Sequence, residues 1–412
     1  MDTFDVVVVG SGAFGASTAF HLAKAGRRVA LVDQAALGSQ TSPRAAGLTG
    51  QLRRTDIMME LARRSVDKMV HFTTETGLPI EYVQAGSLII ARTPEHAAGL
   101  NLAVENGRRF GLDVAMISPE AARDRMPILE MDGIHAVSFT PTDLHLEPEQ
   151  IALGYANAAA SLGCSLMPDT RVTGIVVEGG RVNRVLTERG ELHALAVVDA
   201  AGGWLRLVGN MAGVSLPVVP TRHQLLITEP MRAARPDMPT ARVIDANAYV
   251  RPCRGGLMFG GYEQDPVTVD LAERGPKFRI DDLALDIAVL RRLIKSVEGQ
   301  FPLLKDAPVR EHRGGLPTMT PDGFHLVGPA PGISGLYIIG GCNVGGLSVS
   351  PALGEVLADW IAEGESPDLD MSVMSPARFT QGIPTLELLE RCRLQYANYY
   401  TGQPRDADSR SF

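Results

Sequence analysis

A glycine-rich hexapeptide near the start of the chain has the spacing needed to bind the phosphates of a nucleotide. It consists of Gly10, Ser11, Gly12, Ala13, Phe14 and Gly15, the pattern G-x-G-x-x-G. In such a turn the first glycine permits the tight bend, and the second lets the backbone approach a pyrophosphate. The third lets the following helix pack closely, and the N–H groups at that helix N-terminus attract the anion.

The surrounding elements place the hexapeptide between a strand and a helix. Residues 6–9 are four valines, typical of a buried parallel strand, and residues 16–25 predict a helix. Residues 28–32 predict the next strand, which Asp33 ends, followed by Gln34. Asp33 can accept hydrogen bonds from ribose hydroxyls and would repel a 2′-phosphate, which disfavours NADP. The unit predicts dinucleotide binding, but the motif alone does not separate NAD from FAD.

Two later segments favour FAD. A buried strand over residues 194–201 runs into two glycines and a tryptophan, and another strand over 335–341 ends in a glycine turn. Residues 343–348 then open a second helix, whose N-terminus also faces an anion. FAD can use both N-termini, one at the pyrophosphate and one at the flavin N1–C2=O edge, which becomes negative on reduction. From these segments, we expect the cofactor to be bordered by Ala201, Gly202, Trp204, Gly341, Asn343, Gly345, Gly346 and Leu347.

Composition argues against several other classes of protein. The 412-residue chain has a formal net charge of −8 and no long Lys/Arg run, so a nucleic-acid partner is not expected. Its apolar runs are too short for a membrane span and its first residues are acidic, so we expect no signal peptide and a cytoplasmic location. The sequence predicts no Ser-His-Asp set, carboxylate pair or metal site. Free thiols are expected for Cys164, Cys253, Cys342 and Cys392.

Seven segments carry a resemblance to one flavoprotein superfamily. They are the hexapeptide with Asp33, and residues 44–48, 143–148, 199–204, 222–224, 320–323 and 340–346. Together they resemble the D-amino-acid oxidase superfamily of FAD-dependent oxidoreductases, in particular its sarcosine/dimethylglycine dehydrogenase branch. The resemblance covers most of residues 1–365. It implies an α/β fold in which a Rossmann-like FAD-binding domain is interleaved with an α+β substrate domain built on a mixed sheet.

The resemblance also implies domain boundaries. The FAD-binding domain would comprise residues 1–75, 144–217 and 320–365. The substrate domain would comprise residues 76–143 and 218–319. Residues 366–412 would form a C-terminal extension. No clear pattern follows residue 370, and residues 366–368 and 405–412 are interpreted as linker and tail.

The resemblance places the flavin ring beside one short segment. That segment comprises Arg44, Ala45, Ala46, Gly47 and Leu48, and Val172 completes the predicted cofactor-binding set. Many relatives attach FAD through a histidine at the position of Arg44, and a guanidinium cannot replace that nucleophile. Others use a cysteine shortly before Thr-Pro-Asp, and no cysteine occurs between residues 254 and 341. We therefore expect non-covalent FAD, with Arg44 either stabilising reduced flavin or facing solvent.

The substrate side lacks the carboxylate clamp of simple amino-acid oxidases. In those relatives an arginine precedes Thr-Pro-Asp within Gly-Leu-Arg-Pro, whereas Pro317 occupies that place here. Arg251, on a predicted strand, is the first candidate for an anion clamp, with a structural arginine as the equal alternative. The other candidates for the catalytic pocket, each of which could instead be structural, are His223, Tyr249, Tyr262 and His312.

These features imply oxidation of a C–N bond in a secondary or tertiary amine or amino acid, such as an N-methyl, cyclic or opine-like compound. Hydride would pass to flavin N5 and the imine would hydrolyse, which needs orientation and a dry pocket. The alternatives are a primary amino-acid oxidase and a flavoprotein subunit of a hetero-oligomeric amine dehydrogenase. A homo-oligomer or an electron-accepting partner subunit is left open. Without the long C-terminal region of the dehydrogenases, formaldehyde capture on folate is not expected.

Overall fold

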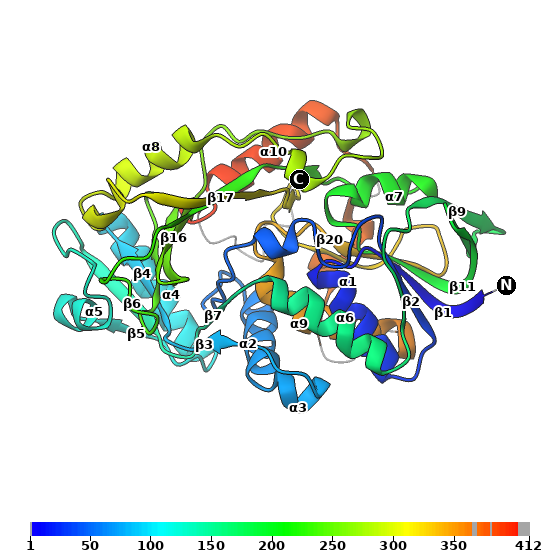
Figure 1. Ribbon diagram of the computed structural model, residues 1–412, viewed down its shortest axis with the longest axis horizontal. Helices are drawn as coiled ribbons and strands as arrows, with labels where there is room; N and C mark the ends of the chain where they lie inside the picture. Colours follow the sequence, from blue (N-terminus) through cyan, green and yellow to red (C-terminus); the bar gives the residue numbers. More distant parts are fainter. Residues whose placement is uncertain (1, 365–368, 380, 403–412) are drawn as a thin grey trace.

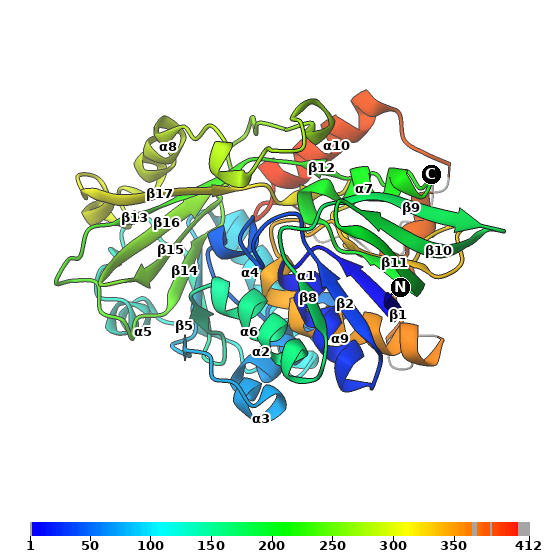
Figure 2. The same ribbon diagram turned by 45° about the vertical axis from the view of Figure 1, so that its right-hand side comes forward.

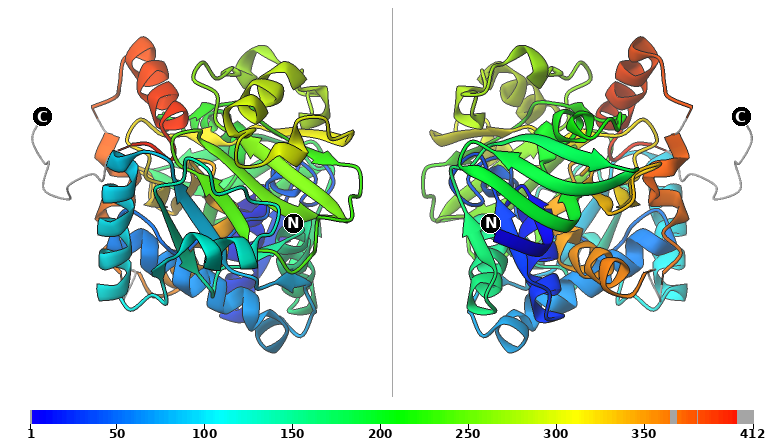
Figure 3. Two further views of the ribbon diagram at one scale, coloured as in Figure 1. Left: turned by 90° about the vertical axis from the view of Figure 1, so that its left-hand side faces the viewer. Right: turned by 90° about the vertical axis from the view of Figure 1, so that its right-hand side faces the viewer.

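Two eight-stranded sheets form the framework of the computed structural model, which describes residues 2–364, 369–379 and 381–402. Figure 1 shows the sheets side by side along the longest axis of the molecule. Figure 3 views the molecule from its two ends, with a different sheet nearest the viewer in each panel. Segments that the sequence predicts to be functional meet between the sheets.

The first sheet contains the predicted valine strand. Its strands are β1 (Asp2–Val9), β2 (Val29–Val32), β8 (Ser165–Met167), β9 (Val172–Glu178), β10 (Arg181–Thr187), β11 (Gly190–Asp199), β19 (Leu326–Pro329) and β20 (Leu336–Gly340). The order is β19-β20-β11-β1-β2-β8, and β1 pairs in parallel with β2 and β11. β9 and β10 continue from β11 as an antiparallel meander.

Both faces of the first sheet are covered, which explains the unbroken apolar run of β1. The covering helices are α1 (Ala13–Lys24), α6 (Glu149–Ser161), α7 (Leu205–Met211) and α9 (Gly346–Glu363), and α2 (Asp56–Val70) packs on α9. Val6 and Val8 share an apolar core with α1, α6 and α9. Val7 and Val9 point to the opposite face, where β9, β10 and α7 pack (Figure 2).

Close packing of α1 on α9 depends on Gly354. A Cβ at this glycine would lie 2.6 Å from the Cβ and 2.8 Å from the backbone carbonyl carbon of Ser17 on α1. The Ser17 hydroxyl also donates a hydrogen bond to the carbonyl oxygen of Pro351 in α9 (3.2 Å). The two helices are therefore in direct backbone contact, which fixes how their N-termini lie relative to each other.

The second sheet is mixed. Its strands are β4 (Ser87–Ala91), β5 (Ala115–Ile117), β6 (Ala136–Thr140), β13 (His223–Thr228), β14 (Thr240–Val243), β15 (Ala248–Cys253), β16 (Gly256–Gly261) and β17 (Val309–Gly315). The order is β17-β13-β16-β15-β14-β4-β6-β5, with β14 and β4 parallel and the other pairs antiparallel. Helix α8 (Ile287–Val297) shares an apolar core with this sheet. An α/β fold with a mixed second sheet confirms the predicted fold class.

Register in the second sheet sets a row of side chains toward the first sheet. Arg242 on β14 pairs with Ile89 on β4 and with Tyr249 on β15, which in turn pairs with Gly260 on β16. Paired residues on adjacent strands point to the same face. A Cβ at Gly260 would lie 2.2 Å from the hydroxyl oxygen of Tyr249, so the absence of a side chain lets the tyrosine lie across β16.

Shorter elements complete the described part of the chain. Two-stranded sheets pair β3 (Tyr82–Val83) with β7 (His145–Leu146), and β12 (Val219–Pro220) with β18 (Thr318–Met319). The remaining α-helices among the described residues are α3 (Phe72–Thr76), α4 (Pro94–Arg109), α5 (Pro119–Arg125) and α10 (Thr385–Ala397). Within these described ranges, no helix combines the length and apolar character required to cross a bilayer.

Helix α10 lies in the C-terminal extension, where the sequence shows no clear pattern. Leu388, Cys392 and Tyr396 of this helix are buried in a core shared with Tyr249 and Tyr262 of the second sheet. In Figure 1, α10 lies at the top, above the space between the two sheets. Charged residues surround its narrow buried stripe, which hides the helical pattern. Residues 366–368 and 405–412 lie outside the described residues.

Replacing Gly354 with alanine should destabilise the packing of α1 on α9. The added Cβ would meet backbone as well as the Ser17 side chain, and such overpacking costs about 1–3 kcal/mol. Denaturant unfolding measures the change in unfolding free energy. Gly99→Ala on α4 is the matched control, because nothing lies within 4 Å of a Cβ there and alanine is favoured by about 0.5–1 kcal/mol in a helix. Equal stability of the two variants would contradict this packing argument.

Candidate functional site

A cavity of about 1150 Å³ lies between the two sheets. Residues that follow β1, β2, β11 and β20 line one part, and residues of β13, β14 and β15 line another. Pockets for drug-sized ligands measure about 300–1,000 Å³. The volume therefore suits a large cofactor together with a small substrate.

The hexapeptide forms a turn that requires glycine at two positions. Gly10 has a φ of +103°, and a Cβ there would lie 2.5 Å from a backbone carbonyl oxygen after β11. A Cβ at Gly15 would lie 1.8 Å from the carbonyl oxygen of Gly10, so α1 lies directly on the turn. Gly12, Ala13 and Phe14, at the N-terminus of α1, line the cavity. This is the backbone cradle that a pyrophosphate needs.

Asp33 fastens this turn to the end of β2. Its Oδ2 accepts hydrogen bonds from the backbone N (2.8 Å) and the hydroxyl (2.7 Å) of Ser11, and its Oδ1 accepts one from the backbone N of Ala35 (2.9 Å). Burial raises the pKa of Asp33, while the bonds from Ser11 and Ala35 oppose that rise. A carboxylate offers about four acceptor sites. Asp33 therefore keeps acceptor capacity for a ribose hydroxyl while it shapes the turn.

A second helix N-terminus borders the same cavity. Gly346 opens α9, and a Cβ there would lie 3.1 Å from the ring of Phe14 on α1. The preceding Asn343 has a φ of +42°; its Oδ1 accepts from the backbone N of Thr320 (2.9 Å), and its Nδ2 donates to the carbonyl of Gly341 (2.8 Å). Two helix N-termini at one cavity fit a ligand with a pyrophosphate and a second electronegative edge, which is the chemistry of FAD.

Nearly all residues predicted to bind the cofactor line this cavity. Those that do are Gly10, Gly12, Ala13, Phe14, Asp33, Gln34, Arg44, Ala45, Ala46, Gly47, Leu48, Val172, Ala201, Gly202, Trp204, Asn343, Gly345, Gly346 and Leu347. Gly15 and Gly341 support the lining from behind: a Cβ at Gly341 would lie 2.5 Å from the Thr320 methyl carbon. Contact of each residue with bound FAD stays a prediction.

Arg44 is held at the edge of the cavity by its own loop. Its guanidinium donates hydrogen bonds to the carbonyls of Ser39 and Gln40 and forms an ion pair with Asp281. Three of its donors are therefore directed at protein acceptors. Its predicted role as a cation beside the flavin would have to act through space, and it stays a prediction.

His223 is buried between two tyrosines at the substrate side. Its Nδ1 lies 2.8 Å from the hydroxyl of Tyr396 and its Nε2 lies 2.8 Å from the hydroxyl of Tyr249. Burial lowers the pKa of His223 to about 4, so the imidazole is neutral at ordinary pH. A neutral imidazole has one donor and one acceptor nitrogen. One tyrosine therefore donates to the ring and the other accepts from it.

Five tyrosines form an aromatic wall beside His223: Tyr249, Tyr262, Tyr396, Tyr399 and Tyr400. The last three come from the C-terminal segment. The Tyr399 and Tyr262 rings are stacked with centroids 4.4 Å apart, and Tyr399 and Tyr400 both line the cavity. Buried Asn247 docks the segment: its Nδ2 donates to the carbonyl of Ala397 (2.6 Å), and its Oδ1 accepts from the backbone N of Tyr400 (2.9 Å). Sequence reasoning missed these tyrosines. Their spacing at positions 396, 399 and 400 is the signal of one helix face that could have found them.

The predicted anion clamp, Arg251, lies away from the cavity, so its position does not support that role, which stays a prediction. It does not line the cavity among the described residues, and its guanidinium is fully buried. Nε donates to the carbonyl of Ala46 (2.7 Å), Nη1 to that of Pro252 (2.8 Å), and Nη2 pairs with Glu147 (3.0 Å). Arg251 instead anchors the loop at Ala46 to the second sheet. Most of its donors are therefore directed at protein acceptors.

His312 is also outside the cavity lining of the described residues. Its Nε2 lies 3.2 Å from Oε1 of Gln224, and the ring is only partly buried. Its placement does not support a role in the pocket, and that role stays a prediction. In contrast, His223, Tyr249 and Tyr262 come together at one wall as the sequence suggested, although their part in catalysis stays a prediction.

Arg242 is a buried cavity residue that the sequence interpretation missed. It is flanked by Ile89 and Tyr249 in the row described above. Its Nη2 lies 3.5 Å from the carbonyl oxygen of Thr49, and a Cβ at Gly50 would lie 2.4 Å from that nitrogen. The missing side chain at Gly50 therefore gives the guanidinium its place. Arg242 lies on a four-residue strand, too short for its facing side to be read from sequence.

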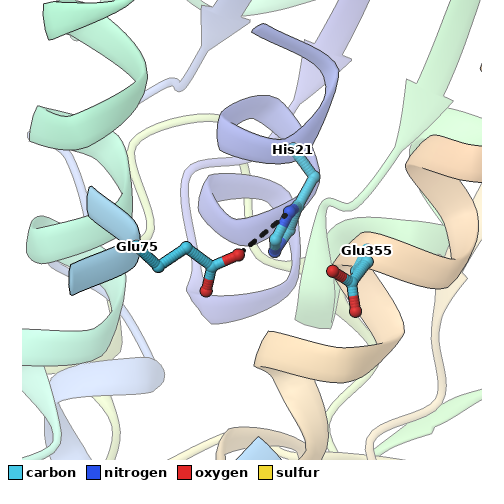
Figure 4. A group of neighbouring side chains, drawn as sticks. All are labelled: His21, Glu75 and Glu355. Atoms are coloured by element: carbon cyan, nitrogen blue, oxygen red, sulfur yellow. Dashed lines mark ion pairs between the residues drawn. The ribbon is translucent and has the colours of Figure 1, made fainter. Parts of the chain in front are cut away.

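A separate polar cluster has metal-ligand types but is built as an ion-pair network. His21, Glu75 and Glu355 place one potential ligand atom each within 4.8 Å of one another (Figure 4). The Lys68 ammonium lies 2.9 Å from the Glu75 carboxylate and 2.6 Å from that of Glu355, and Lys24 lies 2.9 Å from Glu75. These lysines already neutralise the carboxylates. Its ion pairs link helices α1, α2, α3 and α9 outside the cavity lining.

Comparison with known proteins agrees with the geometry of the cavity. The family model described as FAD dependent oxidoreductase (DAO) matches residues 5–360. The chain belongs to this family. Mitochondrial sarcosine dehydrogenase of Mus musculus is 31% identical over 410 residues, which is 97% of this chain and 44% of that protein. The 4-methylaminobutanoate oxidase (formaldehyde-forming) of Paenarthrobacter nicotinovorans is 30% identical over 383 residues, covering 91% of this chain and 45% of the oxidase.

Solved structures of family members share the fold. L-proline dehydrogenase from P. horikoshii has a TM-score of 0.83 at 26% identity, covering 92% of this chain and 98% of that one. Glycine oxidase from Geobacillus kaustophilus has a TM-score of 0.80 at 25% identity, covering 93% and 100%. Membership of the family confirms FAD as the cofactor. The chain spans less than half the length of the sarcosine dehydrogenase and the methylaminobutanoate oxidase.

Buried His223 should make the folded state sensitive to acid. The unfolded chain protonates this imidazole near pH 6.5, but the folded-state pKa is about 4, so stability is lost as the pH falls from above 6.5 towards 4. This difference in pKa corresponds to roughly 3 kcal/mol. The unfolding free energy of the wild type minus that of His223→Gln should decrease by about this amount between pH 7 and pH 4.

Denaturant titrations at the two pH values provide the measurement. Tyr396→Phe is the control, because it removes a hydroxyl at the same site and keeps the imidazole. The difference between wild type and Tyr396→Phe should change little with pH. A difference between wild type and His223→Gln that does not vary with pH would contradict a buried neutral imidazole.

Proposed function

We propose that this FAD-dependent oxidoreductase oxidises a C–N bond in a secondary or tertiary amine or amino acid. The observation that carries the proposal is the buried wall of tyrosines around neutral His223, in the cavity that the two cofactor-facing helix N-termini also border. The names of related proteins support it, since dimethylglycine dehydrogenase and 4-methylaminobutanoate oxidase refer to methylated amines. Cyclic amino acids are supported by the similarity to L-proline dehydrogenase.

Bound FAD supplies the acceptor for the hydride. The protein must bind the amine in its neutral form, because the nitrogen lone pair stabilises the C=N bond that forms as hydride leaves. Burial against Tyr249 and Tyr262 disfavours a charged amine, as desolvation lowers an amine pKa. His223 stays uncharged down to a pH near its pKa of about 4, so the wall adds no positive charge beside the developing iminium.

The tyrosines also orient the substrate and exclude water. The Tyr262–Tyr399 stack presents flat apolar surface, and the hydroxyls of Tyr249 and Tyr396 are fixed by His223. A fixed wall holds the reacting carbon in one geometry, which is how an enzyme lowers the entropic part of a barrier. The N-terminus of α9 offers positive potential to negative charge that develops at the cofactor end of the cavity.

A primary amino-acid oxidase is the second candidate. Glycine oxidase from Geobacillus kaustophilus matches 88% of this chain and 94% of its own length at 28% identity, which favours this alternative. Against it, Pro317 lines the cavity where such oxidases are expected to carry their clamp. A flavoprotein subunit with an electron-accepting partner remains a further proposal, for which copurification of a stoichiometric partner is the test. Cytoplasmic location stays a prediction, as the matched sarcosine dehydrogenases are mitochondrial.

The flavin should be bound without a covalent link. Arg44 cannot serve as the attaching nucleophile. Burial raises the pKa of the Cys342 thiol, which lines the cavity and accepts a hydrogen bond from the backbone N of Thr318 (3.3 Å), so it stays a poorly nucleophilic thiol. Acid precipitation should release free FAD into the supernatant. Flavin that stays with the precipitated wild-type chain and is lost from a Cys342→Ser chain would contradict the prediction.

N-alkylated or cyclic amino acids should reduce the flavin faster than glycine or D-alanine. The larger substrates gain contacts with the aromatic wall, whereas a small primary amine leaves it unfilled and is less well oriented. Anaerobic stopped-flow bleaching of the flavin across matched substrates measures the rates. Sarcosine against glycine is the minimal pair, because the two differ by one N-methyl group. Faster reduction by glycine or D-alanine than by every N-alkyl or cyclic amino acid would refute the assignment.

A further inference from the structure

We infer that Arg242 binds the carboxylate of the substrate, which selects amino acids among the amines that the cavity admits. The inference rests on the proposed function for the identity of the reacting amine. The binding of an anion at Arg242 is a separate property that can be measured without turnover. Arg242 would replace the clamp that Pro317 does not provide and that Arg251 is not placed to provide.

Arg242 lies one strand away from the wall that encloses the amine. It pairs with Tyr249 across β14 and β15, and the hydroxyl of Tyr249 lies 2.8 Å from Nε2 of His223. Neighbouring strands are about 4.8 Å apart. The charge of Arg242 also interacts with Tyr400, Tyr399 and Tyr262, so the guanidinium and the tyrosines are near enough to contact one small molecule. A substrate whose amine rests against the tyrosines therefore directs its carboxylate toward the guanidinium.

The guanidinium of Arg242 has unused hydrogen-bonding capacity. Of its five N–H donors, one reaches a protein acceptor within the described residues, the carbonyl of Thr49 at 3.5 Å. The guanidinium packs directly on Gly50, where a Cβ would lie 2.4 and 2.5 Å from the two terminal nitrogens, and Arg242 lines the cavity. A planar fork with free donors is suited to bidentate binding of a carboxylate.

The charge of Arg242 also lacks direct compensation within the described chain. The nearby buried carboxylate of Asp143 lowers the electrostatic cost but forms no ion pair with it at 4.0 Å or less. Asp143 is engaged elsewhere: its oxygens accept from the hydroxyl of Ser87 (2.5 Å) and from the backbone N of Gln51 (2.9 Å). A buried charge without a partner is costly. An anionic substrate would supply that partner.

Among the described residues, three of the other four arginines that line the cavity are held by protein acceptors. Arg44 and Arg171 each form an ion pair with an acidic side chain, and Arg54 donates to a backbone carbonyl. Arg53 is the rival candidate, because its Nη2 donates to the hydroxyl of Ser348 (2.9 Å) and its buried Nε has no partner among the described residues. The experiment must therefore separate Arg242 from Arg53.

Methoxyacetate and methoxyacetamide are the probes that test the inference. They carry a neutral ether oxygen in place of the amine nitrogen, and this oxygen supports hydride loss too weakly for turnover, so binding can be followed in the holoenzyme by the change in flavin absorbance. The wild type should bind the acid more tightly than the amide. Arg242→Gln should weaken binding of the acid about 10- to 100-fold, as expected for lost charge-assisted hydrogen bonds. Binding of the amide should change less than about threefold.

Arg53→Gln is the matched control and should preserve the preference for the acid. Arg242→Lys keeps the charge but loses the fork, so its affinity should fall between those of wild type and Arg242→Gln. The wild-type comparison needs no variant: equal affinity for acid and amide, or no binding of the acid, would overturn the inference. Loss of the preference in Arg53→Gln with retention in Arg242→Gln would also overturn it. If carboxylate binding depends on Arg242 but no amine reduces the flavin, the inference about Arg242 holds and only the proposed amine oxidation is refuted.

Discussion

Charge that is buried between the two sheets must be compensated or avoided, and this requirement arranges the substrate side of the molecule. Arg251 is compensated by Glu147 and by backbone carbonyls, so it serves as an anchor. His223 avoids the cost because it stays neutral between two hydroxyls. The carboxylate of Asp143 lies near Arg242, but no acidic side chain of the described residues forms an ion pair with it, and an anionic ligand would supply that partner. The same electrostatic cost thus separates an anchor from a binding group.

The half of the molecule built on the first sheet depends on close contacts between backbone segments of its helices and strands. Gly10 and Gly15 bring the N-terminus of α1 onto the end of β1, and Gly354 brings α9 against α1. These contacts hold two helix N-termini at one cavity, so the positive potential at its cofactor end comes from backbone geometry. Asp33 adds the local clamp, since its carboxylate fixes the turn while it borders the cavity. The residues that would hold the cofactor are therefore fixed by local backbone contacts, whereas the substrate side of the cavity is built from distant parts of the chain.

This division explains which features could be predicted from sequence. The phosphate cradle is encoded by neighbouring residues, so its spacing and the acid at Asp33 identify it. The substrate wall depends on register between strands and on loops that cover them. Arg242 and Arg251 lie on adjacent strands, but Arg251 meets the loop at Ala46, whereas Arg242 packs on Gly50 and lines the cavity. No local pattern distinguishes the two, and none shows that Tyr396 reaches His223 from 173 residues away.

The docking of Tyr396 on His223 has a consequence for the order in which the chain acquires its parts. On the ribosome, the glycine-rich turn and Asp33 emerge first, and every strand of both sheets has been made once β20 is complete. The contact between His223 and Tyr396 can form only after a further stretch has been translated. The substrate wall is thus finished after the framework of both sheets, and a nascent chain stalled before residue 396 would carry a cofactor cradle whose substrate side is still open.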